Sequence, residues 1–114
     1  MHDSCAPTSN AVKQGDNWLA AEIPRIMASS AYRNGGAIFV TWDEGRLSLS
    51  CLSNNCPFGM IVISTLGKGG GYANSIAYTH SSTLRTMQEI FGVTPLLRGA
   101  ATATDLRDLF RTFP

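Results

Sequence analysis

Two short apolar segments constrain the fold of this chain more than any other feature of its sequence. Residues 37–42 read AIFVTW and residues 58–64 read FGMIVIS, and both are rich in β-branched and aromatic residues. Such segments form strands, and continuous apolarity without alternation is typical of strands buried on both faces, as in a parallel sheet. Two strands make a poor independent sheet, because three or more are normally needed. The sequence therefore predicts part of a larger mixed or partly parallel sheet.

Helical patterns surround the two strands. Residues 11–29 repeat apolar positions near a period of 3.6, with a kink or break expected at Pro24. Residues 81–91 form a second helix that ends at Gly92. Its predicted apolar face consists of Leu84, Met87, Ile90 and Phe91. The order of elements predicts an α/β domain whose sheet is flanked by helices.

The last predicted helix covers residues 102–110, with Thr102 or Thr104 as its cap and Asp105 in its first turn. Trp18 and Trp42 fit positions in the core and need no functional explanation.

Composition limits the class of protein. A chain of 114 residues forms one domain at most, which we expect to span residues 1–114. Nine basic residues are scattered among eight acidic ones, so no nucleic-acid partner is expected. No apolar run approaches the roughly 20 residues of a membrane span. Met1 leads directly into polar HDSCAPTSN, so we expect no signal peptide, and the sequence leaves the localisation open.

Two carboxylates follow the first strand, in the sequence WDEG. Asp43 and Glu44 would lie where the strand ends, and ligands of open α/β sheets collect at the carboxyl ends of strands. Two hard oxygen ligands suit a divalent cation. The alternative is that both carboxylates face solvent. His80, at the start of a helix, and the pair His2 and Asp3 would join them if these segments lie at the same sheet edge.

The segment between the second strand and the next helix contains GKGGG. Lys68 and the backbone amides of Gly69, Gly70 and Gly71 could bind an anion, because glycines allow close backbone approach. A flexible surface loop explains the sequence equally well, and no P-loop pattern is present. Ser81 and Ser82 lack the surroundings of a nucleophile elbow, so we interpret them as helix caps.

Three cysteines, Cys5, Cys51 and Cys56, fit either reduced thiols or one disulfide with one free thiol. With His2 they could also form a zinc site, although the spacings match common zinc motifs only loosely.

Four parts of the sequence resemble the C-terminal portion of the phosphoesterase family that contains acid phosphatases and phospholipase C-type enzymes, within the alkaline phosphatase superfamily. They are HDSCAPTSNAVKQGDNWLAAEIPRIMAS, GGAIFVTWDEG, GMIVIS and GKGGGYANSIAYTHSSTLRTMQEIFGVTPLL with ATDLRDLF. The resemblance implies a mixed α/β sheet between helices and a metal-dependent phosphoester hydrolase acting on a small phosphoester or a phospholipid headgroup. It implies that Asp43, Glu44 and Asp3 bind metal and that His80 and His2 are catalytic. A secreted or extracellular location would also fit this family.

The chain differs from this family in three respects, one of which is that RGAATATDL lacks an acidic residue that family members often show there. Family members are longer, and the metal-binding motif and Ser or Thr nucleophile of their N-terminal part have no counterpart before His2. The segment RLSLSCLSNNC also replaces their short glycine-rich continuation. We therefore expect the isolated chain to be a weak or inactive hydrolase that associates with itself or with a missing N-terminal half. The alternatives are a non-catalytic α/β interaction module and a small zinc-stabilised domain.

Overall fold

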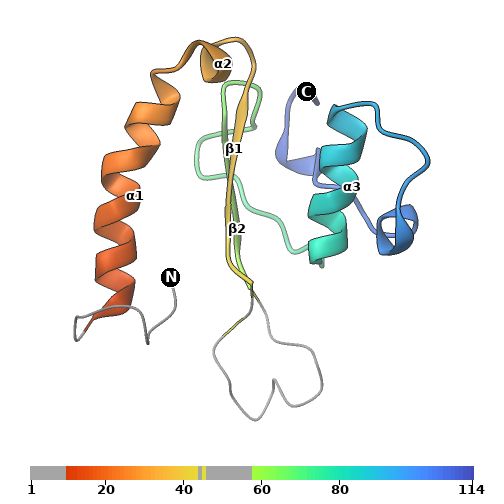
Figure 1. The fold of residues 1–114 in the computed structure, drawn as a ribbon, viewed down its shortest axis with the longest axis horizontal. Helices are drawn as coiled ribbons and strands as arrows, with labels where there is room; N and C mark the ends of the chain where they lie inside the picture. The colour runs from red at the N-terminus through yellow and green to blue at the C-terminus, as the bar shows by residue number, and fades with distance from the viewer. Residues whose placement is uncertain (1–9, 44, 46–57) are drawn as a thin grey trace. The chain divides into compact units, whose positions relative to one another are not determined.

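The structure, a computed structural model, describes residues 10–43, 45 and 58–114 (Figure 1). The chain divides into two compact units, Met1–Asn34 and Gly35–Pro114. Among the described helices, none is long and apolar enough to cross a membrane. The mixed α/β class expected from the sequence is confirmed by the order of the elements, in which helices precede and follow a pair of strands.

The first unit contains α1, Ala11–Met27, and the short α2, Ser30–Arg33. The side chain of Asn10 caps α1 by accepting a hydrogen bond from the Lys13 amide at 2.9 Å. The helix runs through Pro24 without ending there, so of the predicted kink or break the break is wrong and the kink stays a prediction. Trp18 is 61% exposed, and its predicted core position is therefore also wrong.

The second unit begins with an antiparallel hairpin of β1, Ala37–Thr41, and β2, Met60–Ser64. The register pairs Ala37 with Ser64 at one end and Thr41 with Met60 at the other. The parallel arrangement predicted for these strands is wrong for this pair. A parallel pair requires a crossover that returns the chain to the same end of the sheet, whereas here the chain reverses direction between neighbouring strands.

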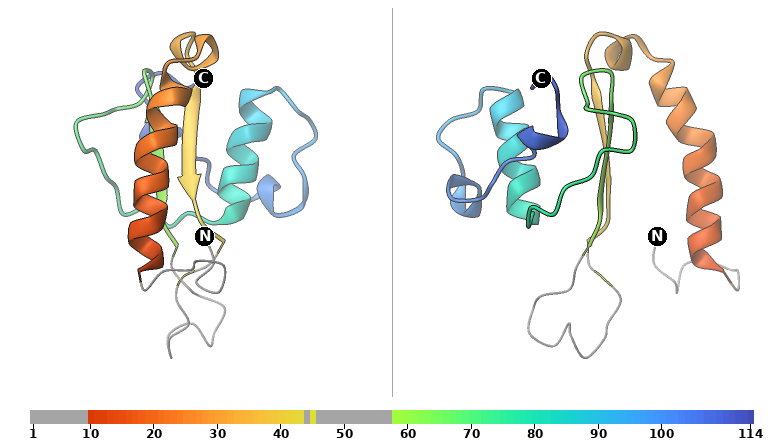
Figure 2. Two further views of the ribbon diagram at one scale, coloured as in Figure 1. Left: turned by 60° about the vertical axis from the view of Figure 1, so that its left-hand side comes forward. Right: turned by 180° about the vertical axis from the view of Figure 1, so that it is seen from behind.

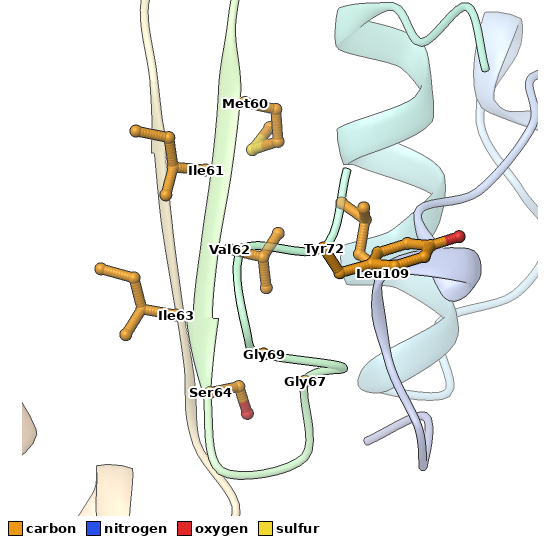
Figure 3. A pocket seen from close by; sticks show the side chains of 10 residues that line it. Met60, Ile61, Val62, Ile63, Ser64, Gly67, Gly69, Tyr72 and Leu109 are labelled. Atoms are coloured by element: carbon orange, nitrogen blue, oxygen red, sulfur yellow. The ribbon is translucent and has the colours of Figure 1, made fainter. Parts of the chain in front are cut away.

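One face of this hairpin is covered by the C-terminal part of the same unit. Val62 points toward Leu109, whereas Ile61 and Ile63 point the other way (Figure 3). Phe39, the register partner of Val62, has its ring centroid 6.2 Å from that of Phe110. The sequence predicted that both faces of the strands are buried. In the structure, the face that carries Phe39 and Val62 is covered more than the face that carries Ile61 and Ile63.

Trp42 follows β1 and is 45% exposed, so its predicted core position is wrong. Its indole ring occupies the space into which a side chain at residue 59 would project, and that residue is Gly59. The ring covers the neighbouring backbone at the end of the hairpin.

The helix α3, His80–Ile90, begins with a reciprocal capping box. The Thr79 hydroxyl accepts from the Ser82 amide at 3.3 Å, and the Ser82 hydroxyl accepts from the Thr79 amide at 3.0 Å. The interpretation of Ser82 as a capping residue is confirmed.

The face that α3 buries is polar, which reverses the predicted orientation. Its buried residues are Ser82, Thr86 and Gln88. Leu84, Met87 and Phe91 of the predicted apolar face are exposed, Phe91 by 78%. The buried side chains are needed for hydrogen bonds, because Thr86 accepts from the Leu106 amide at 2.9 Å and Gln88 accepts from the Leu97 amide at 3.1 Å.

The C-terminal segment contains two 3₁₀ turns, η3, Arg98–Ala101, and η4, Arg107–Leu109. The helix predicted over residues 102–110 is wrong for most of its length, because only η4 is helical there. Asp105 lies before η4 and accepts from the Arg107 amide at 2.8 Å. Among the described residues of this unit, the buried hydrophobic ones are Ala100, Leu106 and Phe110, and all three lie in this segment. Figure 2 shows the segment beside α3, on the same side of the hairpin.

Candidate functional site

His80 and Asp43 lie together although 37 residues separate them in the sequence. The Nε2 atom of His80, the first residue of α3, is 2.7 Å from the backbone oxygen of Asp43, just beyond the end of β1. The Phe58 ring stacks on the imidazole with a centroid distance of 4.0 Å and an angle of 9° between the planes. The structure therefore brings one predicted catalytic residue to one predicted metal ligand.

The partner of Nε2 defines the chemistry of the imidazole. A carbonyl oxygen can only accept, so the proton of a neutral His80 ring lies on Nε2. Nδ1 is then the acceptor nitrogen, which can take up a proton or bind a metal ion. The contact thus selects the tautomer and, with Phe58, orients the ring.

A complete metal-ligand set would need residues beyond those that the structure describes. Within residues 10–43, 45 and 58–114, there is no group of three or more His, Cys, Asp and Glu side chains that could hold a metal ion. Three predicted site residues, Glu44, His2 and Asp3, lie outside the described residues, as do the three cysteines. The assignment of metal ligands therefore stays a prediction.

A second polar cluster is centred on Asp108 in η4. Its carboxylate accepts from Lys68 Nζ at 2.9 Å, Tyr72 Oη at 2.7 Å and Asn74 Nδ2 at 2.6 Å. These hydrogen bonds, led by that from Lys68, lower the pKa of Asp108 to about 2. The Asp108 carboxylate in turn raises the pKa of Lys68, whose ammonium also lies 4.1 Å from the centre of the Tyr72 ring.

Lys68 is therefore engaged within the protein in this structure. An anion would have to bind beside an existing carboxylate or displace it. The predicted binding of substrate by Lys68 stays a prediction, and the loop itself is well anchored. The Lys68 amide donates to the Leu109 carbonyl at 3.0 Å, and its carbonyl accepts from Arg111 Nη2 at 2.7 Å.

A cavity of about 240 Å³ lies between the Asp108 cluster and the residues around His80. Its lining residues are Phe58, Met60, Tyr72, Ala73, Asn74, Ile76, Tyr78 and Leu109. Phe58, which stacks on His80, thus forms part of the wall. Burial raises the pKa of Tyr78, which accepts a hydrogen bond from Asn74 at 3.1 Å. None of these lining residues carries a charged side chain.

The residues that connect these features do not follow from the sequence patterns. Those patterns predict a helix around Asp108 and assign no role to Tyr72, Asn74 and Tyr78. The sequence YANSIAY does carry a signal, because two tyrosines and an asparagine in a long loop need partners for their polar groups. Its partner could not be foreseen, since Asp108 is 34 residues from Asn74.

Comparison of the chain with models of protein families, with curated proteins and with solved structures gives no match.

Proposed function

We propose that this chain forms part of a metal-dependent phosphoester hydrolase with the C-terminal portion of an alkaline phosphatase-like fold. The proposal combines the resemblance of the WDEG and YTHSS segments to phosphoesterases with one observation. The ring of His80 lies 2.7 Å from the backbone of Asp43, so two segments that the resemblance assigns to one active site meet in space.

The predicted residues have distinct roles in this proposal. Asp43, Glu44 and Asp3 hold a divalent ion, which when bound polarises the phosphoryl oxygens of the substrate. His80 accepts or donates a proton at Nδ1, and His2 lines the same site. The backbone of Gly69 and Gly70, with Lys68, binds the non-reacting part of a small phosphoester or phospholipid headgroup.

Thermal unfolding with and without Mn²⁺, Zn²⁺ or Ca²⁺ tests the metal site. A bound ion stabilises the folded state by RT ln(1 + [L]/Kd), about 2.7 kcal/mol at a hundredfold excess over Kd. We expect this stabilisation in the wild type, its loss in Asp43→Asn, and its retention in Asp16→Asn, which changes an exposed carboxylate of α1. A wild-type melt that ignores all three ions would contradict metal binding by this chain.

A non-catalytic interaction module is the second candidate function. The observation that favours it is the exposed apolar face of α3, formed by Leu84, Met87 and Phe91. Hydrolysis of p-nitrophenyl phosphate can exclude the non-catalytic module, whereas slow turnover agrees with both candidates. We expect the isolated chain to be very slow, and turnover on the order of 10 s⁻¹, the median for enzymes, would exclude the purely non-catalytic function.

A further inference from the structure

The dipeptide Asn34–Gly35 follows α2 directly in the chain. The Asn34 amide donates the last helical hydrogen bond of α2, to the Ser30 carbonyl at 2.9 Å. Gly35 has a φ of +88°, in the left-handed region that favours glycine. The turn that ends α2 therefore favours a residue without a Cβ directly after an asparagine.

The fold does not hold the peptide group between these two residues. Within residues 10–43, 45 and 58–114, no hydrogen bond is donated by the Gly35 amide or accepted by the Asn34 carbonyl. The side-chain amide of Asn34 has no hydrogen-bond partner in this part of the chain either, and Asn34 is exposed to solvent. Rotation of this peptide group and of the Asn34 side chain therefore breaks no hydrogen bond that the structure describes.

The side chain of Asn74 has the opposite environment. Its Nδ2 atom donates to Asp108 Oδ2 at 2.6 Å and to Tyr78 Oη at 3.1 Å. Its Oδ1 atom accepts from the Ile76 amide at 3.1 Å. The amide group is thus held at both its nitrogen and its oxygen, although a small residue, Ser75, follows it in the sequence. The chain therefore offers a held asparagine with which Asn34 can be compared.

We propose that Asn34 is a site of spontaneous modification, at which asparagine converts to a mixture of aspartate and isoaspartate. The Gly35 nitrogen attacks Cγ of Asn34, a C–N bond forms, and the side-chain nitrogen leaves as ammonia with the proton of the Gly35 amide. Water then opens the resulting cyclic imide at either carbonyl and leaves a carboxylate, whose proton the ammonia takes up. A Cβ at residue 35 would hinder the attack, so the glycine that the turn favours also favours the reaction. This inference does not depend on phosphoester hydrolysis.

The experiment incubates the purified 114-residue chain in mildly alkaline buffer and follows both asparagines by peptide mapping with mass spectrometry. A protease that cleaves before aspartate places residues 34 and 74 in different peptides, which begin at Asp16 and Asp43. The same protease cleaves before residue 34 where aspartate has formed and leaves isoaspartate uncut. We expect conversion at residue 34 to be at least about tenfold faster than at residue 74, which corresponds to about 1.4 kcal/mol in activation free energy.

Incubation in urea separates the effect of the fold from that of the dipeptide sequence. Because the folded chain leaves Asn34 unrestrained, unfolding should change its rate by less than about threefold, whereas Asn74 loses its hydrogen bonds and should accelerate about tenfold. Asn34→Gln is the control variant, because it keeps an exposed amide but would need a larger ring, and we expect no conversion at residue 34. Conversion at residue 34 that is no faster than at residue 74 in the folded chain, or equal acceleration of both residues by urea, would overturn the proposal.

Discussion

The α3 region and the β1–β2 hairpin are stabilised in different ways. Leu106 is completely buried against the α3 region, and its amide is satisfied by the buried hydroxyl of Thr86. In the hairpin, by contrast, no residue of either strand is fully buried, and Ile61 is 53% exposed. The comparison teaches that secondary structure of equal regularity can carry very different shares of the stability. The first region has its own packed centre, whereas the hairpin leaves apolar surface that further contacts could cover.

The largest expected effect comes from removing the packed centre. Leu106→Ala should lower the free energy of unfolding by about 2–5 kcal/mol, because it deletes a completely buried side chain and leaves a cavity. Leu97→Ala is the matched control, since that leucine is 54% exposed and its loss should cost clearly less. Urea denaturation measures both. Equal losses of stability in the two variants would mean that Leu106 does not lie in a packed core that stabilises this region.

A smaller effect is expected from the hydrogen bond at the same place. Thr86→Val removes the hydroxyl that donates to the Ser82 carbonyl and accepts from the Leu106 amide, so a buried amide loses its partner. We expect a loss of about 1–3 kcal/mol. Thr83→Val is the control on the same helix, because the buried Thr83 hydroxyl has no hydrogen-bond partner among the described residues.

For Thr83→Val we expect neutral or increased stability, because an unpaired buried hydroxyl is replaced by a methyl group. Chemical denaturation of both variants would refute the distinction if Thr83→Val proved as harmful as Thr86→Val.

The Asp108 cluster, which joins the glycine-containing loop to η4, should respond to acid. The pKa of Asp108 is lowered in the folded state from 3.8 to about 2, so its contribution is complete above about pH 4 and is lost as the pH falls toward 2. Lys68 stays charged throughout this range, because the ordinary pKa of lysine already lies far above it and the Asp108 carboxylate raises the pKa further. Thermal melts from pH 7 to pH 2 should show a steeper loss of stability in the wild type than in Asp108→Asn.

Lys68→Met removes the first partner of the same carboxylate and should likewise flatten the acid dependence. If both variants kept the wild-type profile between pH 4 and pH 2, the cluster would contribute nothing to folding.

The smallest effect on stability is expected in the hairpin. Ile61 is largely exposed on β2, so Ile61→Ser should change the free energy of unfolding by less than about 1 kcal/mol. It should nevertheless reduce the self-association that we expect from exposed apolar strands. Light scattering measures that association, and a wild type that remains monomeric with a cooperative melt would argue against it.

The positions of the main elements could be predicted from the sequence. The helix expected over residues 11–29 is α1, the helix expected over residues 81–91 is α3, and the two apolar segments are β1 and β2. These predictions depend on local periodicity and on signals such as Gly92, which act within a turn or two.

The faces and partners of these elements could not be predicted in the same way. Apolar periodicity assigned Leu84 and Phe91 to the core, but α3 buries Thr86 and Gln88 because their side chains hydrogen-bond to segments that come later in the chain. The predicted parallel arrangement of the strands was wrong for a related reason. A run of apolar residues carries no information about the direction in which a neighbouring strand runs. At the candidate site, the meeting of His80 with Asp43 was a prediction from sheet geometry, whereas Asp108 gave no local signal.

The glycine loop has a consequence for chirality. Gly70 has a φ of +60° and open space where a Cβ would project. L-residues disfavour this region of the backbone map, but it is the ordinary helical region for D-residues by mirror symmetry. A chemically synthesised chain with D-alanine at residue 70 should therefore fold to the same loop and be more stable than the natural chain. The methyl group would restrict the unfolded backbone, as alanine does wherever it replaces a glycine of compatible geometry. L-alanine at the same position should instead make the chain less stable. The difference in stability between the two variants would therefore show that the turn needs a left-handed backbone conformation at residue 70.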